Sequence, residues 1–125
     1  MDRKNIFKQL AFLILFIFAV NFFANKFYWY YSVRYLDMIM HFLGGFWVGL
    51  VFLWLFYLEN LSVRLVFKII LGVLLIGILW EVFEILVNNS IAQNPFNVLD
   101  TLSDLLFDLF GGLCAILYLC IRLLK

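Results

Sequence analysis

The chain has 125 residues, of which 67% are hydrophobic and 14% charged, and its formal net charge is +1. A soluble domain averages about 45–50% apolar and about 25% charged residues, and a chain of this length cannot bury so much apolar surface in water. The composition therefore excludes a soluble domain and predicts an integral membrane protein. With no basic stripe and no glycine-rich phosphate loop, we expect no nucleic-acid partner.

Four apolar segments are long enough to cross a membrane, which takes about 20 residues of helix. They cover residues 6–23, 36–57, 65–87 and 102–121. We therefore predict an all-α fold, a polytopic membrane protein with a four-transmembrane-helix bundle, and treat residues 1–125 as a single transmembrane domain. The aromatic run at 27–31 suits the headgroup level between the first two spans.

The lysines and arginines predict the orientation of the bundle. If both termini are cytoplasmic, seven basic residues lie inside, and only Lys26 and Arg34 lie outside. This distribution satisfies the positive-inside rule. We expect a multi-pass protein of the bacterial inner (cytoplasmic) membrane with cytoplasmic N and C termini.

Six acidic residues lie in or at the mouths of the spans, where an ionised carboxylate costs roughly 2.5–3.5 kcal/mol at the bilayer centre. A rise of about 1.5 Å per residue places them all, with the only histidine, in the outer half of the membrane. The residues are Asp37, His41, Glu81, Glu84, Asp100, Asp104 and Asp108. Each span carries its polar residues on one helix face, so we expect these faces to meet inside the bundle.

A short motif occurs twice, on the two spans that run from outside to inside. Asp37-x-x-x-His41-x-x-Gly44-Gly45 matches Asp104-x-x-x-Asp108-x-x-Gly111-Gly112. The repeat indicates two helical hairpins related by an axis along the membrane normal, with chance similarity as the alternative. Small residues let helix backbones approach closely. We expect the four glycines, together with Arg34 and Asp100, to line or support a pocket.

Clustered carboxylates repel one another unless protons or a cation neutralise them. Our first hypothesis is a divalent metal site of Mg²⁺, Mn²⁺, Ca²⁺ or Zn²⁺. Its ligands would be Asp37, His41, Glu81, Glu84, Asp104 and Asp108. A metal at this depth would serve a hydrolase or transferase acting on a membrane lipid or a lipid-linked envelope precursor.

Two other functions fit the same residues. Intramembrane acids and histidine can form an ion or solute pathway, although the inner half of the spans offers no polar route. Protonated carboxyls can also join helices in a non-catalytic assembly or resistance protein. The sequence leaves open whether two copies pair as a homo-oligomer to complete the site.

Single residues carry narrower expectations. Asp100 is expected to be the N-cap of the last span, Trp80 to be a packing residue, and Asn21 and Asn25 to be interfacial. Arg34 either sits at the headgroups, pairs with Asp37 or binds a phosphate. His41 is either a ligand or a satisfied interior histidine.

Residues 36–42, Leu-Asp-Met-Ile-Met-His-Phe, resemble the Asp-x-x-x-His-Phe start of a helix in VanZ-like membrane proteins and in the related YjdF-like family. Trp80 to Glu84 and Asp100 to Gly112 are similar to the last two helices of the YjdF-like group. Glu84 and Asp108 depart from the VanZ-like pattern of glutamine and asparagine, which favours the YjdF-like branch. The resemblance implies the four-helix architecture and a cell-envelope role, and it implies no defined activity.

Overall fold

The structure, a computed structural model, describes residues 3–33, 35–56, 62–87 and 97–123. It contains four long helices, and each is long and apolar enough to cross a membrane. They are α1 (Arg3–Lys26), α3 (Leu36–Leu55), α4 (Val63–Val87) and α5 (Val98–Leu123). No β-strand occurs in the described residues. The predicted four-helix membrane bundle is therefore confirmed.

Two helix ends differ from expectation. Tyr28 has a left-handed backbone conformation, with φ of 57°, and the one-turn helix α2 (Trp29–Ser32) follows it in the aromatic run. At the start of α5, the side-chain oxygen of Asn97 accepts hydrogen bonds from the backbone amides of Leu99 (3.1 Å) and Asp100 (3.3 Å). Asn97 is thus the N-cap, and the expectation that Asp100 fills this role was wrong because α5 begins earlier than its apolar run predicted.

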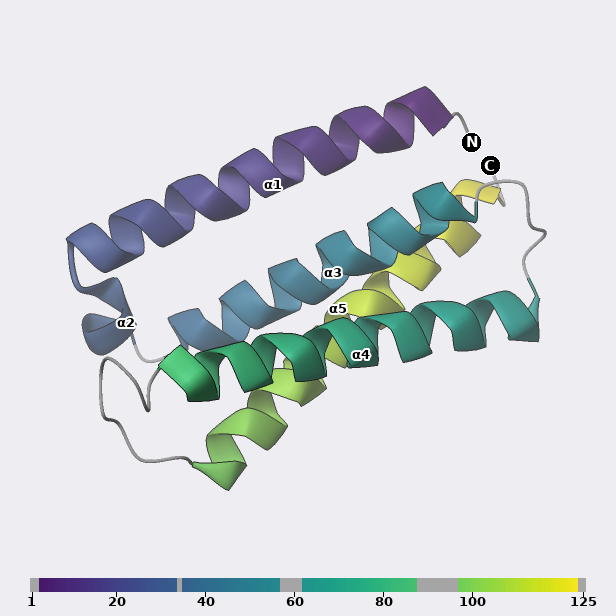
Figure 1. The fold of residues 1–125 in the computed structure, drawn as a ribbon. Coiled ribbons are helices and arrows are strands. Elements are labelled where there is room, and N and C mark those ends of the chain that lie inside the picture. Colours follow the sequence, from purple (N-terminus) through teal and green to yellow (C-terminus); the bar gives the residue numbers. More distant parts are fainter. Residues whose placement is uncertain (1–2, 34, 57–61, 88–96, 124–125) are drawn as a thin grey trace.

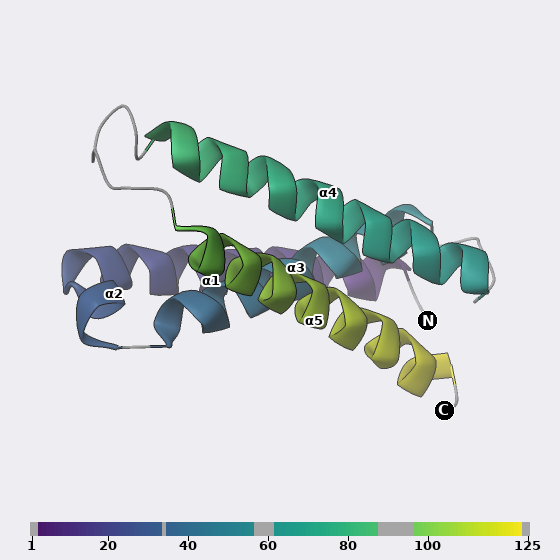
Figure 2. The same cartoon turned by 90° about the horizontal axis from the view of Figure 1, so that it is seen from below.

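The long helices alternate in direction, so that α1 and α4 run opposite to α3 and α5 (Figure 1). Both views place the two ends of the chain at the same end of the bundle, called here the terminal end (Figures 1 and 2). Helix α3 is central, because it packs against α1, α4 and α5. Within the described residues α1 does not pack against α4.

Glycine allows α3 and α5 to touch backbone to backbone. A Cβ atom on Gly45 would collide with the backbone carbonyl of Asp108, and one on Gly111 would collide with the carbonyl of Phe42. Further along the crossing, a Cβ on Gly49 would lie 2.7 Å from that of Ala115. Each copy of the repeated motif therefore supplies a glycine that meets the other copy's backbone, as close helix packing in membranes requires.

The terminal half of the bundle is an apolar core. Its buried side chains are Ile6, Leu10, Leu50, Leu53, Leu65, Ile69, Val73, Ala115 and Ile116. Two hydrogen bonds fasten α1 here: Trp47 Nε1 donates to the Leu10 carbonyl (2.9 Å), and the Tyr118 hydroxyl donates to the Gln9 side-chain oxygen (2.8 Å). The buried polar side chains, those of His41, Glu81, Asp104 and Asp108, lie toward the opposite end of the bundle.

Candidate metal site

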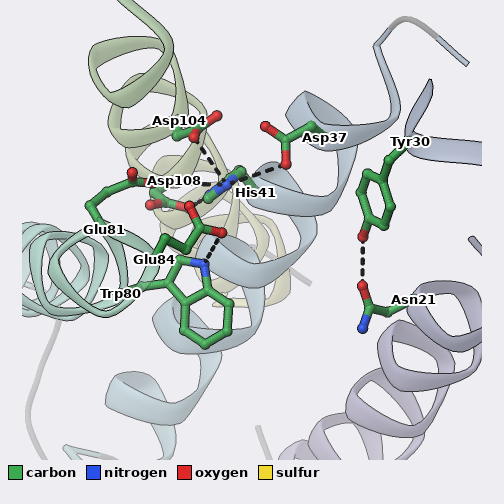
Figure 3. A network of polar contacts seen from close by, with 9 residues as sticks. All are labelled: Asn21, Tyr30, Asp37, His41, Trp80, Glu81, Glu84, Asp104 and Asp108. Carbon is green, nitrogen blue, oxygen red and sulfur yellow. Dashed lines mark hydrogen bonds and ion pairs between the residues drawn. The ribbon is translucent and has the colours of Figure 1, made fainter. Parts of the chain in front are cut away.

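His41 lies at the centre of the polar end, on the face of α3 that meets α5, and is only 8% exposed. Its Nδ1 atom is 3.1 Å from Asp108 Oδ1, within hydrogen-bond distance. Its Nε2 atom faces three carboxylate oxygens, at 3.4 Å from Asp104, 3.7 Å from Asp37 and 3.9 Å from Glu81 (Figure 3). When Asp108 is ionised, Nδ1 carries a proton and donates it, and Nε2 either carries a second proton, as imidazolium, or presents a lone pair to the other three acids.

Two carboxylate oxygens at this site are buried without a hydrogen-bond partner among the described residues. They are Glu81 Oε1 and Asp104 Oδ1. Glu81 is 5% exposed and Asp104 is 2% exposed. A carboxylate oxygen removed from water without a hydrogen bond in exchange is costly. The arrangement therefore calls for a proton or a cation between these groups.

The charges of the cluster do not balance within the described part of the chain. In that part His41 is the partner in every ion pair formed with the acids. One imidazolium offsets one negative charge, whereas five carboxylates surround it: Asp37, Glu81, Glu84, Asp104 and Asp108. A divalent cation would offset two more charges.

Four of these residues can hold a metal ion. His41, Glu81, Glu84 and Asp104 each offer one ligand atom, and these atoms all lie within 4.8 Å of one another. Ligand atoms bound about 2.1 Å from one ion lie roughly 3.0–3.5 Å apart when adjacent, so a small inward movement would complete the shell. The indole Nε1 of Trp80 donates to Glu84 Oε1 at 3.0 Å and so orients this carboxylate, a contact that the expected packing role did not include.

A cavity of about 590 Å³ lies between α1, α3 and α4 and reaches the acidic cluster. One end is polar, with Asn21, Tyr30, Asp37, His41 and Glu84 on its wall. The remaining wall is mainly apolar and includes Ile14, Ile17, Trp47, Val48, Val73 and Ile76. Gly44 also lines the cavity, and a Cβ atom there would have no neighbouring atom within 4 Å. The cavity thus joins a polar head region to an apolar chamber.

Tyr30 is a member of the polar end that sequence reasoning missed. Its hydroxyl donates to Asn21 Oδ1 at 2.6 Å. Burial raises the pKa of the Tyr30 phenol above its usual value of 10.0, and the charges of Asp37 and Glu84 raise it further. The phenol therefore keeps its proton at neutral pH. Within the aromatic run at 27–31, no pattern distinguishes Tyr30 from its neighbours.

Residues 1–125 match the model of a protein family described as "Predicted membrane protein (DUF2238)". The chain belongs to this family. Comparisons with curated proteins and with solved structures found no match. The DUF2238 description agrees with the four spans and names no activity.

The structure of this DUF2238 chain brings together the six residues predicted as metal ligands, from three different helices (Figure 3). Asp108 contacts Nδ1 of His41, whereas Asp37, Glu81 and Asp104 face its Nε2 atom. Asn21, expected at the interface, joins the polar end of the cavity together with Asn25. Arg34 lies outside the described residues.

The glycines predicted to support the site fall into two groups. Gly45 and Gly111 lie at the α3–α5 crossing, and a Cβ on Gly112 would lie 2.9 Å from a methyl group of Val73. These three glycines hold helices close together. Gly44 only borders the cavity. Gly45 both borders the cavity and touches α5.

Proposed function

We propose that this protein binds a divalent metal ion inside the membrane through His41, Glu81, Glu84 and Asp104. The observation that carries the proposal is the setting of His41. Its Nε2 atom faces Asp104 and a buried oxygen of Glu81 that accepts no hydrogen bond from the described residues, while its other nitrogen is engaged by Asp108. One imidazole with several carboxylates suits Mn²⁺ or Zn²⁺, and the carboxylates alone would also accept Mg²⁺ or Ca²⁺.

Asp108 acts in this proposal as a positioning residue. Metal-binding histidines commonly donate their second ring N–H to a carboxylate, which fixes the tautomer and the ring orientation. The 3.1 Å contact between His41 Nδ1 and Asp108 Oδ1 has this form. It would keep Nε2 unprotonated and directed at the ion.

The cavity supports an amphiphilic substrate. Its volume of about 590 Å³ lies within the roughly 300–1,000 Å³ of small-molecule pockets. A lipid or lipid-linked envelope molecule would place its polar head beside the acids and its chain along Ile17, Val48 and Ile76. A metal ion at the head would polarise an ester or phosphoryl group and activate water, so we propose a metal-dependent hydrolase or transferase.

Transport is less well supported, because the terminal half of the bundle is filled by the apolar core and holds no chain of acids among the described residues. The likeness to VanZ-like and YjdF-like proteins supports a role in the bacterial cell envelope. With both ends of the chain on one side of the bundle, we propose cytoplasmic termini and a site that faces the outer leaflet.

Elemental analysis of the purified full chain tests the proposal. The protein in detergent is loaded separately with Mg²⁺, Mn²⁺, Ca²⁺ or Zn²⁺, freed of excess ion and analysed for bound metal. We expect at least one ion per chain, lost in Glu81→Gln and His41→Ala. The matched control Glu59→Gln removes a carboxylate between α3 and α4 and should retain the metal. Absence of bound metal after all four loadings would overturn the proposal.

A further inference from the structure

The Asp104 carboxylate presents its two oxygens to different surroundings. Oδ2 lies 3.4 Å from His41 Nε2, whereas Oδ1 is buried and has no hydrogen-bond partner among the described residues. Figure 3 shows this second oxygen directed away from His41, on the side where Asp37 lies. With Asp104 only 2% exposed, water does not readily reach the unpaired oxygen.

Asp37, which lies on that side, belongs to a second group of possible ligands. Asp37, Asp100 and Asp104 each offer one oxygen, and the three oxygens lie within 4.8 Å of one another. Asp100 is available for this group because Asn97, not Asp100, caps α5. Asp104 therefore belongs to both possible metal groups and is the residue that joins them.

We infer that the site holds two divalent cations bridged by Asp104. One lies among His41, Glu81, Glu84 and Asp104, and the second among Asp37, Asp100 and Asp104. The inference rests on the proposed function for the first ion and adds a second binding site to it. Bridging carboxylates are a common way to hold two ions about 3.5–4 Å apart, where both act on one substrate group.

The charges support two ions better than one. The cluster and its mouth contain six carboxylates, on Asp37, Glu81, Glu84, Asp100, Asp104 and Asp108. A single divalent ion with a neutral His41 would leave four negative charges if all six were ionised, and a second ion would leave two. Of the remaining charge, that of Asp108 would be stabilised by its hydrogen bond from the metal-bound imidazole.

The two ions would differ in character. The first would be enclosed by a nitrogen and buried oxygens. The second would have only oxygen ligands, with Asp100 exposed and Asp37 partly exposed, and would complete its shell with water. Oxygen ligands favour Mg²⁺, Mn²⁺ or Ca²⁺. We expect the second ion to bind more weakly and to exchange faster.

Manganese provides a direct test on the full chain in detergent. The protein is titrated with Mn²⁺, the bound metal is quantified, and its electron paramagnetic resonance spectrum is recorded. We expect two ions per chain with the spectrum of a spin-coupled pair. Asp100→Asn and Asp37→Asn should each retain one ion and give the spectrum of an isolated ion, whereas Glu59→Gln should match the parent.

Each other outcome overturns a distinct claim. One ion in the parent, unchanged in Asp37→Asn and Asp100→Asn, would overturn the second site and leave the proposed function standing. Two uncoupled ions would overturn the Asp104 bridge. No bound manganese would overturn the pair of ions, while the four separate loadings decide the proposed function. Gel filtration of each variant shows whether it is folded, and the exposed Asp100 provides a result if Asp37→Asn misfolds.

Discussion

His41 and Asp108 are 67 residues apart in the chain, yet their side chains meet at 3.1 Å. The contact occurs where Gly45 lets α3 approach the backbone of Asp108 itself. The same crossing thus sets the distance between the helices and the orientation of the imidazole. It leaves Nε2 directed at the carboxylates on its other side.

Replacing Asp108 with asparagine should weaken metal binding without abolishing it. The amide can still contact Nδ1, but it no longer favours the tautomer with a bare Nε2. Loss of such an outer partner typically costs 10–100-fold in metal affinity. A competition titration with a metal-sensitive dye measures the metal affinity of the Asp108→Asn variant. The titration runs up to saturating metal, where the amount of bound metal is also read. Complete loss of bound metal at saturation would instead make Asp108 a direct ligand.

Gly45→Ala and Gly44→Ala should change stability in opposite directions. The new Cβ at residue 45 collides with the Asp108 backbone, and forced repacking costs typically 1–3 kcal/mol. The Cβ at residue 44 meets open space, and alanine in a helix interior is favoured over glycine by roughly 0.5–1 kcal/mol. Thermal unfolding in detergent, followed by helicity, measures both. Equal effects would show that α3 and α5 do not touch as described.

Filling the cavity should weaken the binding of an amphiphile and spare the metal. Leucine at residue 44 would displace a few methylene groups of the bound chain, each worth about 0.8 kcal/mol, so affinity should fall by at least about tenfold. The probe is a dibrominated octadecyl phosphate, which quenches tryptophan fluorescence. Trp47 and Trp80 line the cavity, so Trp29 and Trp54 are first replaced by phenylalanine.

Gly44→Ala is the matched control for this experiment, because it adds only one methyl group. Metal content is measured in the same samples. Unchanged quenching in Gly44→Leu would place the bound chain elsewhere. Loss of metal in Gly44→Leu would mean that the substitution disturbs the acidic cluster.

Asn97→Ala should destabilise the start of α5 by about 0.5–2 kcal/mol, because the amides of Leu99 and Asp100 lose their acceptor. Asn97→Asp keeps an acceptor oxygen and should remain close to the parent. Asp100→Ala should change the free energy of unfolding less than Asn97→Ala, since Asp100 is not the cap. Denaturant titrations of the metal-free proteins compare the three. A larger effect at Asp100 would return the capping role to that residue.

The spans and the level of the site could be predicted from sequence because both depend on regular quantities. Membrane thickness sets the length of an apolar helix, and the fixed helix rise places Asp37, Glu84 and Asp104 at similar depth. The high cost of charge in lipid marks these residues as exceptional. The sequence therefore indicated which side chains would meet.

Other features depend on packing between helices, which the sequence pattern does not record. Gly44 and Gly45 are neighbours, yet one borders open space and the other touches a backbone, because successive residues point to different sides of a helix. The division of the acids between the two nitrogens of His41 depends on side-chain rotamers. The cavity exists because α1 packs on α3 and not on α4.

The glycine crossing between α3 and α5 has a consequence for how the chain is made. Helix α3 is synthesised well before α5, and it enters the bilayer with Asp37 and His41 while Asp104 and Asp108 are still absent. Membrane helices insert first and associate afterwards. The polar end can therefore assemble only when the last helix has been inserted. Until then the newly made protein carries an incomplete polar cluster, so completion of the chain and assembly of the cluster coincide.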